Sequence, residues 1–411
     1  MHDPRLPSSP GFWRSPLRGP HFTAVLGIVL LVGITVLFVT GLLSYAAYNP
    51  NLSPVNDMTP DKGILGFYLF SWPTNPHWLY RLNQGVHVTL GIALVPVLLA
   101  KLWSVVPRLF TLPPARSLAH ALERLSLLLL VGGALFQFTT GVLNVQLDYI
   151  FPGSFYTLHF YGAWVFFAAF VAHAALKLPT ALRNLRGLRA ARAEDNDLVA
   201  PSPAEPTVSR RGAFGLVGGA SLLLFATSAG RSFDGPLRQT ALLVPRGGPE
   251  PGSGPGGFQI NKTAAYAAID TRETAGDTWR LVVTGRAGVV RLSREELLRL
   301  PLHSAALPIA CVEGWSTSDQ WWRGVRLRDL AALAGYDDPA DVLVESLQQR
   351  GAFRRAALRA NQVADPRSLL ALDVNGEPLT LDHGYPARII VPAAPGVLNT
   401  KWVARMTFGD L

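Results

Sequence analysis

Five apolar runs in the first 230 residues constrain this chain more than any other feature. A helix needs about 20 apolar residues to cross a bilayer. Four runs reach that length, at 21–45, 83–106, 126–145 and 155–178, and a fifth, 212–230, is shorter and rich in glycine. The mean hydropathy of +0.24 agrees with a large membrane portion. The sequence therefore predicts four membrane-spanning helices and a fifth anchor helix.

The basic residues predict how these helices are oriented. Lys and Arg gather before the first run, between the second and third, and after the fourth, whereas the opposite loops carry only Lys62 and Arg81. The positive-inside rule then places the N-terminus in the cytoplasm and everything after residue 230 in the periplasm. This topology accounts for the net charge of +9. No basic stripe is interleaved with stacking aromatics, so we expect no nucleic-acid partner.

The segment between the fourth and fifth runs predicts a cytoplasmic linker, residues 185–211. It ends in Ser209-Arg210-Arg211-Gly212-Ala213-Phe214, directly before an apolar stretch. That pattern resembles a twin-arginine export signal, although it also fits the basic flank of an ordinary span. Because no small-x-small cleavage site follows, we expect the fifth helix to remain as an anchor. The Gly- and Pro-rich residues 231–257 predict a flexible tether to a domain at 258–411.

Four histidines in the apolar runs predict two haem sites. His159 and His173 are 14 residues apart, which places them within about 40° on one helix face and roughly 21 Å apart along the axis. His87 lies level with His159, and His21 lies level with His173. Two such pairs fit six-coordinate, electron-transferring haems. His120 is an alternative to His21 for the inner haem.

The helical part, residues 13–180, resembles the dihaem b-type cytochromes of formate dehydrogenases and nickel–iron hydrogenases, and the cytochrome b561 group. The matching features are Leu79-Tyr80-Arg81 before His87, His159 with Gly162-Ala163-Trp164, and His173. The resemblance implies a four-helix cytochrome domain over residues 1–184 with two b haems, and a haem propionate near Arg81. Because the haems would lie in lipid, we expect a membrane quinone or quinol as the partner.

Beyond the tether the periodicity changes to that of short strands. Trp279–Val283, 290–292, 342–344 and 388–391 read as strands, and Ser293 caps a predicted helix that ends at Leu300. The segment 325–333 is amphipathic. Many short strands and few helices predict a mixed α+β, mainly β domain.

Cys311 is the only cysteine, so an intrachain disulfide is excluded. It follows the apolar run 306–310 and precedes Val312-Glu313-Gly314-Trp315-Ser316. A thiolate there is a competent ligand for a high-valent metal. Two alternatives are a nucleophile served by His303 or His383, and an inert buried thiol.

The segment Ala310–Ser316 resembles the cofactor-cysteine motif of the sulfite oxidase family of molybdopterin enzymes, near the branch of the periplasmic methionine sulfoxide reductase catalytic subunit. Asn375–Leu379, Asp382–Arg388 with Val391-Pro392, and Lys401-Trp402 match in the same order. The resemblance covers 258 to the C-terminus. It implies that Cys311 binds molybdenum beside a molybdopterin. The implied pterin contacts are Asn261, Ser346, His383, Arg388, Asn399, Thr400 and Lys401. The turn after Ser346, residues 348–351, departs from the family pattern.

Together these features predict a converter between two-electron oxygen-atom transfer at molybdenum and one-electron transfer through haem. The substrate is a small oxo compound or an oxidised protein, with Glu313, Trp315 and Trp321 as pocket candidates, unless the tryptophans only pack the domain. The resemblance favours a quinol-driven sulfoxide-type reductase. A sulfite-type oxidase that feeds quinone, or a non-catalytic electron-transfer cytochrome, are the alternatives.

Overall fold

A computed structural model describes residues 6–7, 9, 12–53, 57–59, 70–110, 117–186, 200, 202–243, 245, 254–275 and 277–411. Most of the predicted linker, much of the predicted tether, and the side chain of His120 lie outside this description, as does Lys62. The chain forms two compact units. The first combines 1–39, 89–143 and 158–227, and the second combines 40–88, 144–157 and 228–411.

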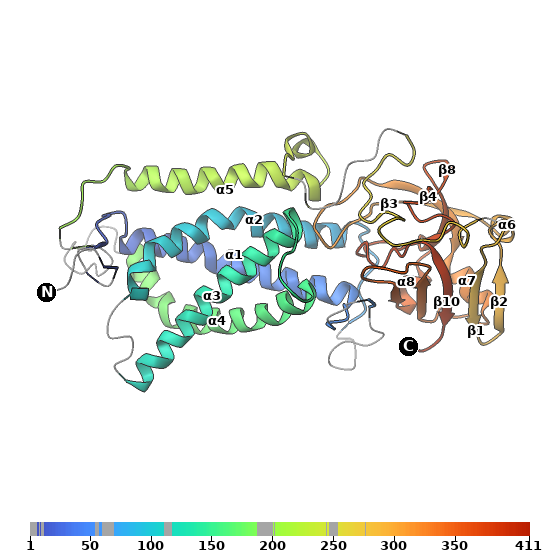
Figure 1. Cartoon of the computed structure of the whole chain (residues 1–411), viewed down its shortest axis with the longest axis horizontal. Helices are drawn as coiled ribbons and strands as arrows, with labels where there is room; N and C mark the ends of the chain where they lie inside the picture. Colours follow the sequence, from blue (N-terminus) through green and yellow to red (C-terminus); the bar gives the residue numbers. More distant parts are fainter. Residues whose placement is uncertain are drawn as a thin grey trace. The chain divides into compact units, whose positions relative to one another are not determined.

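Five long helices occupy the predicted apolar runs, and the predicted helical region is confirmed. They are α1 Pro20–Tyr48, α2 Leu79–Val105, α3 Leu118–Gln146, α4 Phe155–Arg186 and α5 Arg210–Ser232, with a short 3-10 helix, η2 Val106–Phe110, after α2 (Figure 1). Within the described part of the chain, these five are long and apolar enough to cross a membrane, by length and composition. Insertion and topology remain predictions.

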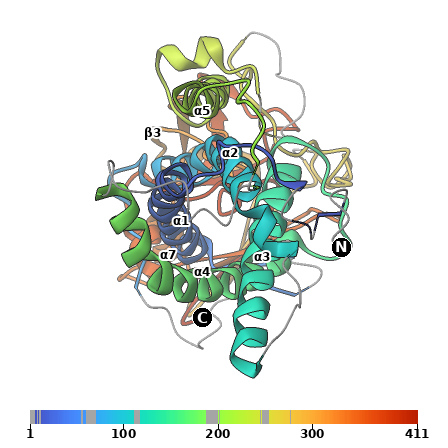
Figure 2. The same ribbon diagram turned by 90° about the vertical axis from the view of Figure 1, so that its left-hand side faces the viewer.

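The first unit packs its helices through apolar and small side chains. Phe22 and Leu26 of α1, Leu94 of α2 and Phe166 of α4 belong to one buried cluster. A Cβ at Gly133 of α3 would lie 3.0 Å from Phe166, so the missing side chain lets the two helices approach closely. Figure 2, seen nearly end-on, shows α1–α4 gathered into a bundle with α5 on one side.

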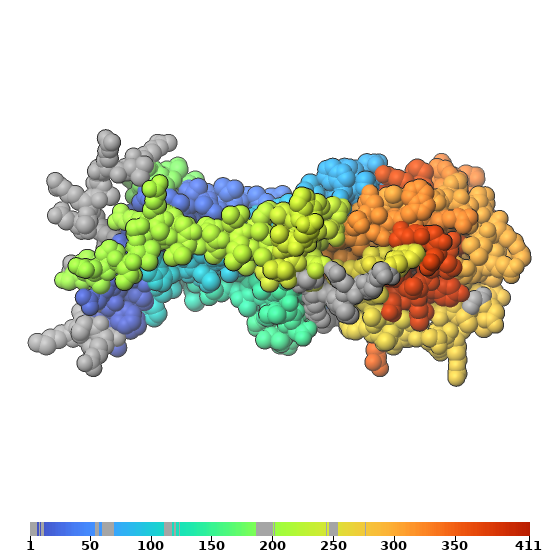
Figure 3. Space-filling view, turned by 90° about the horizontal axis from the view of Figure 1, so that it is seen from above, coloured from blue at the N-terminus to red at the C-terminus, as the bar shows by residue number. Residues whose placement is uncertain are grey.

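Helix α5 packs on α1 with one edge and leaves the other uncovered. Phe214 lies 4.8 Å from Phe22, between ring centroids. Leu216, Leu222 and Leu223 are each more than 60% exposed, and α5 (lime green) lies uncovered on the face drawn in Figure 3. An apolar face of this kind suits contact with lipid.

The second unit is built on two sheets, in the mixed, mainly β arrangement that the sequence predicts. One is five-stranded, ordered β2-β1-β10-β5-β6, and the other runs β3-β4-β7-β8, with β9 also paired to β7. The strands are β1 Leu281–Gly285, β2 Gly288–Leu292, β3 His303–Leu307, β4 Gln320–Arg326, β5 Val342–Ser346, β6 Arg355–Leu358, β7 Leu369–Val374, β8 Glu377–Pro378, β9 Arg388–Ile390 and β10 Val403–Phe408. Strands β1 and β10 pair in parallel, and the other pairs between these strands are antiparallel.

Short helices connect the strands: α6 Arg294–Arg299, α7 Leu327–Leu333, α8 Ala360–Ala364 and the 3-10 helix η4 Pro236–Thr240. The predicted Ser293 cap is confirmed, because its hydroxyl accepts from the Glu296 N–H and the Glu296 carboxylate accepts from the Ser293 N–H. The amphipathic segment 325–333 is only partly helical. Its first two residues end strand β4, and their ladder bonds to β7 hold them extended.

The second unit also includes residues from one end of each of the five long helices. Tyr48 of α1 and Tyr80 of α2 are buried in the same apolar cluster as Leu281 of β1 and Val344 of β5. The indole N–H of Trp72 donates a 2.8 Å hydrogen bond to the carbonyl oxygen of Ala393. The helix ends are therefore part of the core that supports the sheets.

Candidate functional site

The predicted cysteine lies in a tight loop after β3. The Cys311 N–H donates to the carbonyl oxygen of Trp315 at 2.8 Å, and the Gly314 N–H donates to that of Cys311 at 3.0 Å. Gly314 has a φ of +94°, which glycine adopts without steric cost. Ala310 and Ser316 form an isolated antiparallel bridge across the neck of the loop. Residues 310–316, called the cysteine loop below, therefore have a fixed backbone.

The Cys311 thiol is buried and free of any disulfide. Burial raises its pKa well above the ordinary value, the charge of Glu313 raises it further, and Lys262 acts in the opposite direction. The cofactor-free thiol is therefore protonated at neutral pH. A bound metal cation would stabilise the thiolate instead.

The nucleophile alternative is not supported by the histidines proposed to serve it. His383 has Nδ1 at 2.8 Å from the Thr380 hydroxyl and Nε2 at 3.3 Å from the Phe258 carbonyl oxygen. Both of its ring nitrogens thus have partners other than Cys311. His303 begins β3, with its Nε2 at 3.9 Å from the Asp329 carboxylate.

A cavity lies beside the cysteine loop. Six of the seven implied pterin contacts line it, together with Trp315. These six are Asn261, His383, Arg388, Asn399, Thr400 and Lys401. Cys311 lies directly behind the cavity lining. Ile309 and Trp315 on either side of it line the cavity, and a Cβ at Gly396 would lie 3.7 Å from the Cys311 Cα.

Three cations converge on this cavity, and each donates hydrogen bonds to main-chain oxygens. Arg388 donates to His383 at 2.9 Å and to Asn399 at 3.2 Å. Lys401 donates to the carbonyl oxygens of Asp382, at 2.8 Å, and of Lys262. Lys262 donates to that of Ala352 at 2.9 Å. Among the described residues, no carboxylate forms an ion pair with any of the three.

Burial makes these cations costly without an anion. It lowers the pKa of Arg388 to about 9 and that of Lys262 to about 8. It lowers the pKa of Lys401 well below the ordinary value, and the charges of Arg388 and Lys262 lower it further. A phosphate group in the cavity would offset this repulsion and accept charge-assisted hydrogen bonds.

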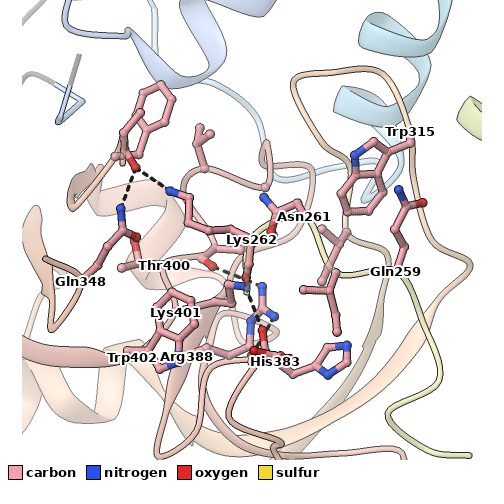
Figure 4. A pocket seen from close by; sticks show the side chains of 18 residues that line it. Gln259, Asn261, Lys262, Trp315, Gln348, His383, Arg388, Thr400, Lys401 and Trp402 are labelled. Carbon is pink, nitrogen blue, oxygen red and sulfur yellow. Dashed lines mark hydrogen bonds between the residues drawn. The ribbon is translucent and has the colours of Figure 1, made fainter. Parts of the chain in front are cut away.

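Five buried polar atoms around the cavity have no hydrogen-bond partner within the described part of the chain. They are Arg388 Nε, Asn399 Nδ2, Thr400 Oγ1, Trp315 Nε1 and Gln259 Nε2. All five belong to residues that line the cavity, and Figure 4 shows Trp315 and Gln259 on one flank with Lys262, Lys401 and Arg388 facing them. Buried donors without partners are destabilising, so this donor set fits a ligand rich in acceptors, such as a pterin with a phosphate.

The cavity lining does not include three of the predicted residues, Ser346, Trp321 and Glu313. Ser346 does not line the cavity. Its hydroxyl donates to the Lys401 carbonyl oxygen at 2.7 Å, which supports the Lys401 main chain. Trp321 on β4 is 54% exposed and lies outside the lining. Glu313 lies in the cysteine loop, half-buried.

Sequence reasoning missed several lining residues, notably Gln259, Lys262, Gln348 and Phe353. Lys262 directly follows the predicted pterin contact Asn261, and a basic residue at that place was the available signal. Phe353 gave no such signal. Within the described residues, no group of three or more His, Cys, Asp or Glu could hold a metal.

The four predicted haem ligands lie on long helices. His21 is on α1, with its ring 6.2 Å from that of Phe214. His87 is on α2, with Nδ1 at 3.0 Å from the Thr40 hydroxyl. His159 and His173 are both on α4 and half-buried. A Cβ at Gly41 would lie 3.2 Å from the His87 ring, and one at Gly141 would lie 3.8 Å from the His159 ring. Pairing across a haem remains a prediction.

Comparison with known proteins identifies the sheet domain. Residues 268–410 match the model of the oxidoreductase molybdopterin binding domain. Mitochondrial sulfite oxidase of Rattus norvegicus is 33% identical over 158 residues, which are 32% of this chain and 29% of that protein. The uncharacterized oxidoreductase YuiH of Bacillus subtilis is 33% identical over 131 residues, which are 32% of this chain and 65% of that protein.

A solved structure, the sulfane dehydrogenase SoxCD from Paracoccus pantotrophus, matches at 25% identity over 33% of this chain and 39% of that chain, with a TM-score of 0.30. The chain spans less than a third of the rat enzyme's length. The matched residues contain Cys311, the three motifs that follow it, and two of the three cations of the cavity. Residues 268–410 of this chain therefore form an oxidoreductase molybdopterin-binding domain of the sulfite oxidase type.

Proposed function

We propose that this chain is a membrane-anchored molybdenum oxidoreductase. It exchanges electrons between an extracytoplasmic oxygen-atom-transfer site and the quinone pool through two b haems. Its most direct role is that of a quinol-driven reductase of sulfoxide-type substrates. The observation that carries the proposal is the set of five buried donors that lack partners within the described residues, together with one buried and two half-buried cations, in one cavity behind which Cys311 lies.

The chain's own residues suit the binding of molybdopterin. Arg388, Lys401 and Lys262 bring positive charge to one cavity, where they would hold the phosphate. Asn399 accepts from the Val391 N–H through Oδ1 at 3.0 Å, which leaves its Nδ2 donor for the ligand. Cys311 would give up its proton and hold the metal through sulfur. When bound, the cofactor supplies two-electron oxygen-atom transfer.

The burial of the cysteine loop supports the same proposal. Cys311 and Trp315 are each at most 4% exposed, so water has little access to the side of the metal held by the thiolate. The indole N–H of Trp315 lacks a partner within the described residues and belongs to a lining residue. It would orient the pterin or a substrate oxygen by donating a hydrogen bond. Glu313 and Trp321 remain candidates for the approach of substrate.

The membrane part of the proposal rests on helices and histidines. The five helices are long and apolar enough to span a bilayer. In the proposal His87 with His159 holds the outer haem, and His21 with His173 holds the inner one. When bound, haems held by these histidines would supply one-electron transfer between the molybdenum site and a quinone or quinol. The N-terminus is cytoplasmic and the molybdopterin domain is periplasmic, exported in folded form if Arg210-Arg211 acts as a twin-arginine signal.

A second candidate is a sulfite-type oxidase that feeds quinone. The matches to mitochondrial sulfite oxidases, at 33% identity, favour it. A non-catalytic electron-transfer cytochrome is the least supported, because it gives no role to the unpartnered donors of the cavity.

The test is elemental analysis followed by a substrate panel on the full chain in detergent. We expect about one molybdenum and two haem irons per chain. We also expect quinol oxidation that depends on a sulfoxide, and a weaker reaction or none with sulfite and quinone. Cys311→Ser should lose turnover and keep both haem spectra. Absence of molybdenum from wild-type protein made in cells that synthesise the cofactor would overturn the proposal, and dominant sulfite oxidation would select the second candidate.

A further inference from the structure

The cysteine loop contacts the second turn of helix α2, within the second unit. The side-chain amide of Gln84 donates a hydrogen bond to the carbonyl oxygen of Val312, the residue after Cys311. A Cβ at Gly314 would lie 2.7 Å from that of Val88, so the loop backbone rests directly on this side chain. Both contacts come from residues outside the matched domain, 268–410.

Gln84 is held in the orientation that this hydrogen bond requires. The Ser44 hydroxyl donates to Gln84 Oε1 at 2.7 Å, and Ser44 Oγ lies 3.0 Å from the hydroxyl of Tyr80. Tyr80 is fully buried, and Gln84 is 7% exposed. Because Oε1 is the acceptor of one bond, Nε2 is fixed as the donor toward Val312.

The other end of the loop is held by the residues that end α5 and follow it. The Ser316 N–H donates to the Arg231 carbonyl oxygen at 2.8 Å, and its hydroxyl donates to that of Ser232 at 2.8 Å. Arg238 donates to the Ser316 carbonyl oxygen at 3.0 Å. The cysteine loop is thus bonded at both ends to segments that precede the molybdopterin-binding domain.

We propose that Gln84 and Val88 are positioning residues for Cys311, so that α2 supplies part of the oxidoreductase site rather than only an anchor. Gln84 fixes the peptide that follows Cys311, and Val88 sets how closely Gly314 approaches the helix. His87 is next to Val88 in α2. Under the proposed function, the same helical turn therefore contacts the cysteine loop and carries a haem ligand. The link to a haem rests on the proposed function, whereas the positioning role does not.

The first experiment measures the alkylation rate of Cys311 by iodoacetamide in the full chain, made without molybdenum cofactor. Cys311 is the only cysteine, so mass spectrometry reports one site. We expect Gln84→Leu to raise the rate roughly fivefold to tenfold, the effect of losing one hydrogen bond that keeps the loop closed. Asn83→Leu is the matched control. Asn83 is on the same turn and donates through its amide to a main-chain oxygen, that of Thr40 at 2.9 Å, but not to the cysteine loop.

The second experiment tests the packing contact. Gly314→Ala should raise the alkylation rate, because its new Cβ meets Val88. Val88→Ala combined with Gly314→Ala should reverse part of that rise. The reversal is partial because the positive φ at residue 314 still disfavours alanine. This pair keeps the proposal testable if Gln84→Leu fails to fold.

The third readout is the paramagnetic resonance spectrum of molybdenum in the loaded enzyme, which reports the geometry of the metal–sulfur bond. We expect shifted g values in Gln84→Leu and unchanged values in Asn83→Leu. Equal alkylation rates in wild type and Gln84→Leu, or an equal rise in Asn83→Leu, would overturn the positioning role. If wild-type protein made in cells that synthesise the cofactor contained no molybdenum, only the proposed function would be overturned. The positioning role would stand, because the alkylation assay uses neither metal nor haem.

Discussion

Arg388 donates a 2.9 Å hydrogen bond through Nη1 to the carbonyl oxygen of His383, five residues earlier in the chain. Through Nη2 it also binds the carbonyl oxygen of Asn399. One buried guanidinium thus joins the turn that precedes β9 to the turn that precedes β10. Its Nε has no partner within the described residues, and the planar fork leaves that atom available to a ligand while the other two nitrogens stay bonded.

This relationship predicts a strong effect of Arg388→Lys. An ammonium group keeps the charge but cannot bond both turns and a ligand in the same plane. We expect molybdenum and pterin content to fall at least tenfold, since hydrogen bonds to charged groups are worth about 1.5–3 kcal/mol each. Arg405→Lys is the control, because the exposed side chain of Arg405, on β10, lies beside Glu345 of β5 and away from the cavity lining. Normal pterin content in Arg388→Lys would contradict the assigned role.

His383 predicts how stability depends on pH. Burial, together with the charge of Arg388, lowers its pKa from 6.5 to about 4. The His383 ring therefore stays neutral in the folded state, while in the unfolded state it takes up a proton below pH 6.5. Stability is complete above pH 6.5 and is lost as the pH falls toward 4, by at most about 3 kcal/mol.

Thermal unfolding of the cofactor-free full chain between pH 7 and 4 measures this effect. We expect the midpoint to fall with pH in wild type and to fall less in His383→Gln, which has no proton to gain. Bound cofactor should reduce the wild-type dependence, because an anion offsets the nearby charges of Arg388 and Lys401. Identical pH profiles for wild type and His383→Gln would rule out this titration.

Local signals explain what the sequence predicted well. The apolar runs specify helices through their length and composition, and the Ser293 cap is set by Ser293 and Glu296 alone. Helix α2 starts at Leu79 rather than near Asn83, because Tyr80 packs into the apolar core of the second unit and Gln84 is buried as well. An apolar-run criterion cannot register such polar helix ends.

Long-range contacts explain what the sequence could not predict. Lys262 lies at the cavity, where its carbonyl oxygen accepts a hydrogen bond from Lys401, 139 residues later in the chain. The contact between Gln84 and Val312 spans 228 residues. The resemblance predicts Cys311 as the metal ligand and seven pterin contacts, and these roles stay predictions. Of the seven, Ser346 lies outside the cavity lining, with its hydroxyl bonded to the Lys401 carbonyl oxygen.

The position of Ser346 predicts a modest effect of Ser346→Ala. The variant loses one hydrogen bond to the Lys401 carbonyl oxygen and leaves the cavity lining unchanged. We expect about 1 kcal/mol of lost stability and less than a tenfold loss of pterin content. Lys401→Met should cost much more cofactor, because it removes a lining cation. A loss in Ser346→Ala as large as that in Lys401→Met, measured as pterin per chain, would favour direct contact.

The haem assignment predicts which histidine variants lose haem. His159→Ala and His87→Ala should each remove the same one of two haems and halve the haem content, while His173→Ala should remove the other. His21→Ala and His120→Ala then decide the inner ligand, since only the true ligand should match His173→Ala in its spectrum. His77→Ala is the control, because the His77 side chain is 31% exposed and lies 3.3 Å from the carboxylate of Asp319. Pyridine haemochrome assays on the full chain measure the content. Unchanged haem in both His159→Ala and His173→Ala would remove the haems from the proposed electron route, while pterin content in the same samples would still test the molybdenum site.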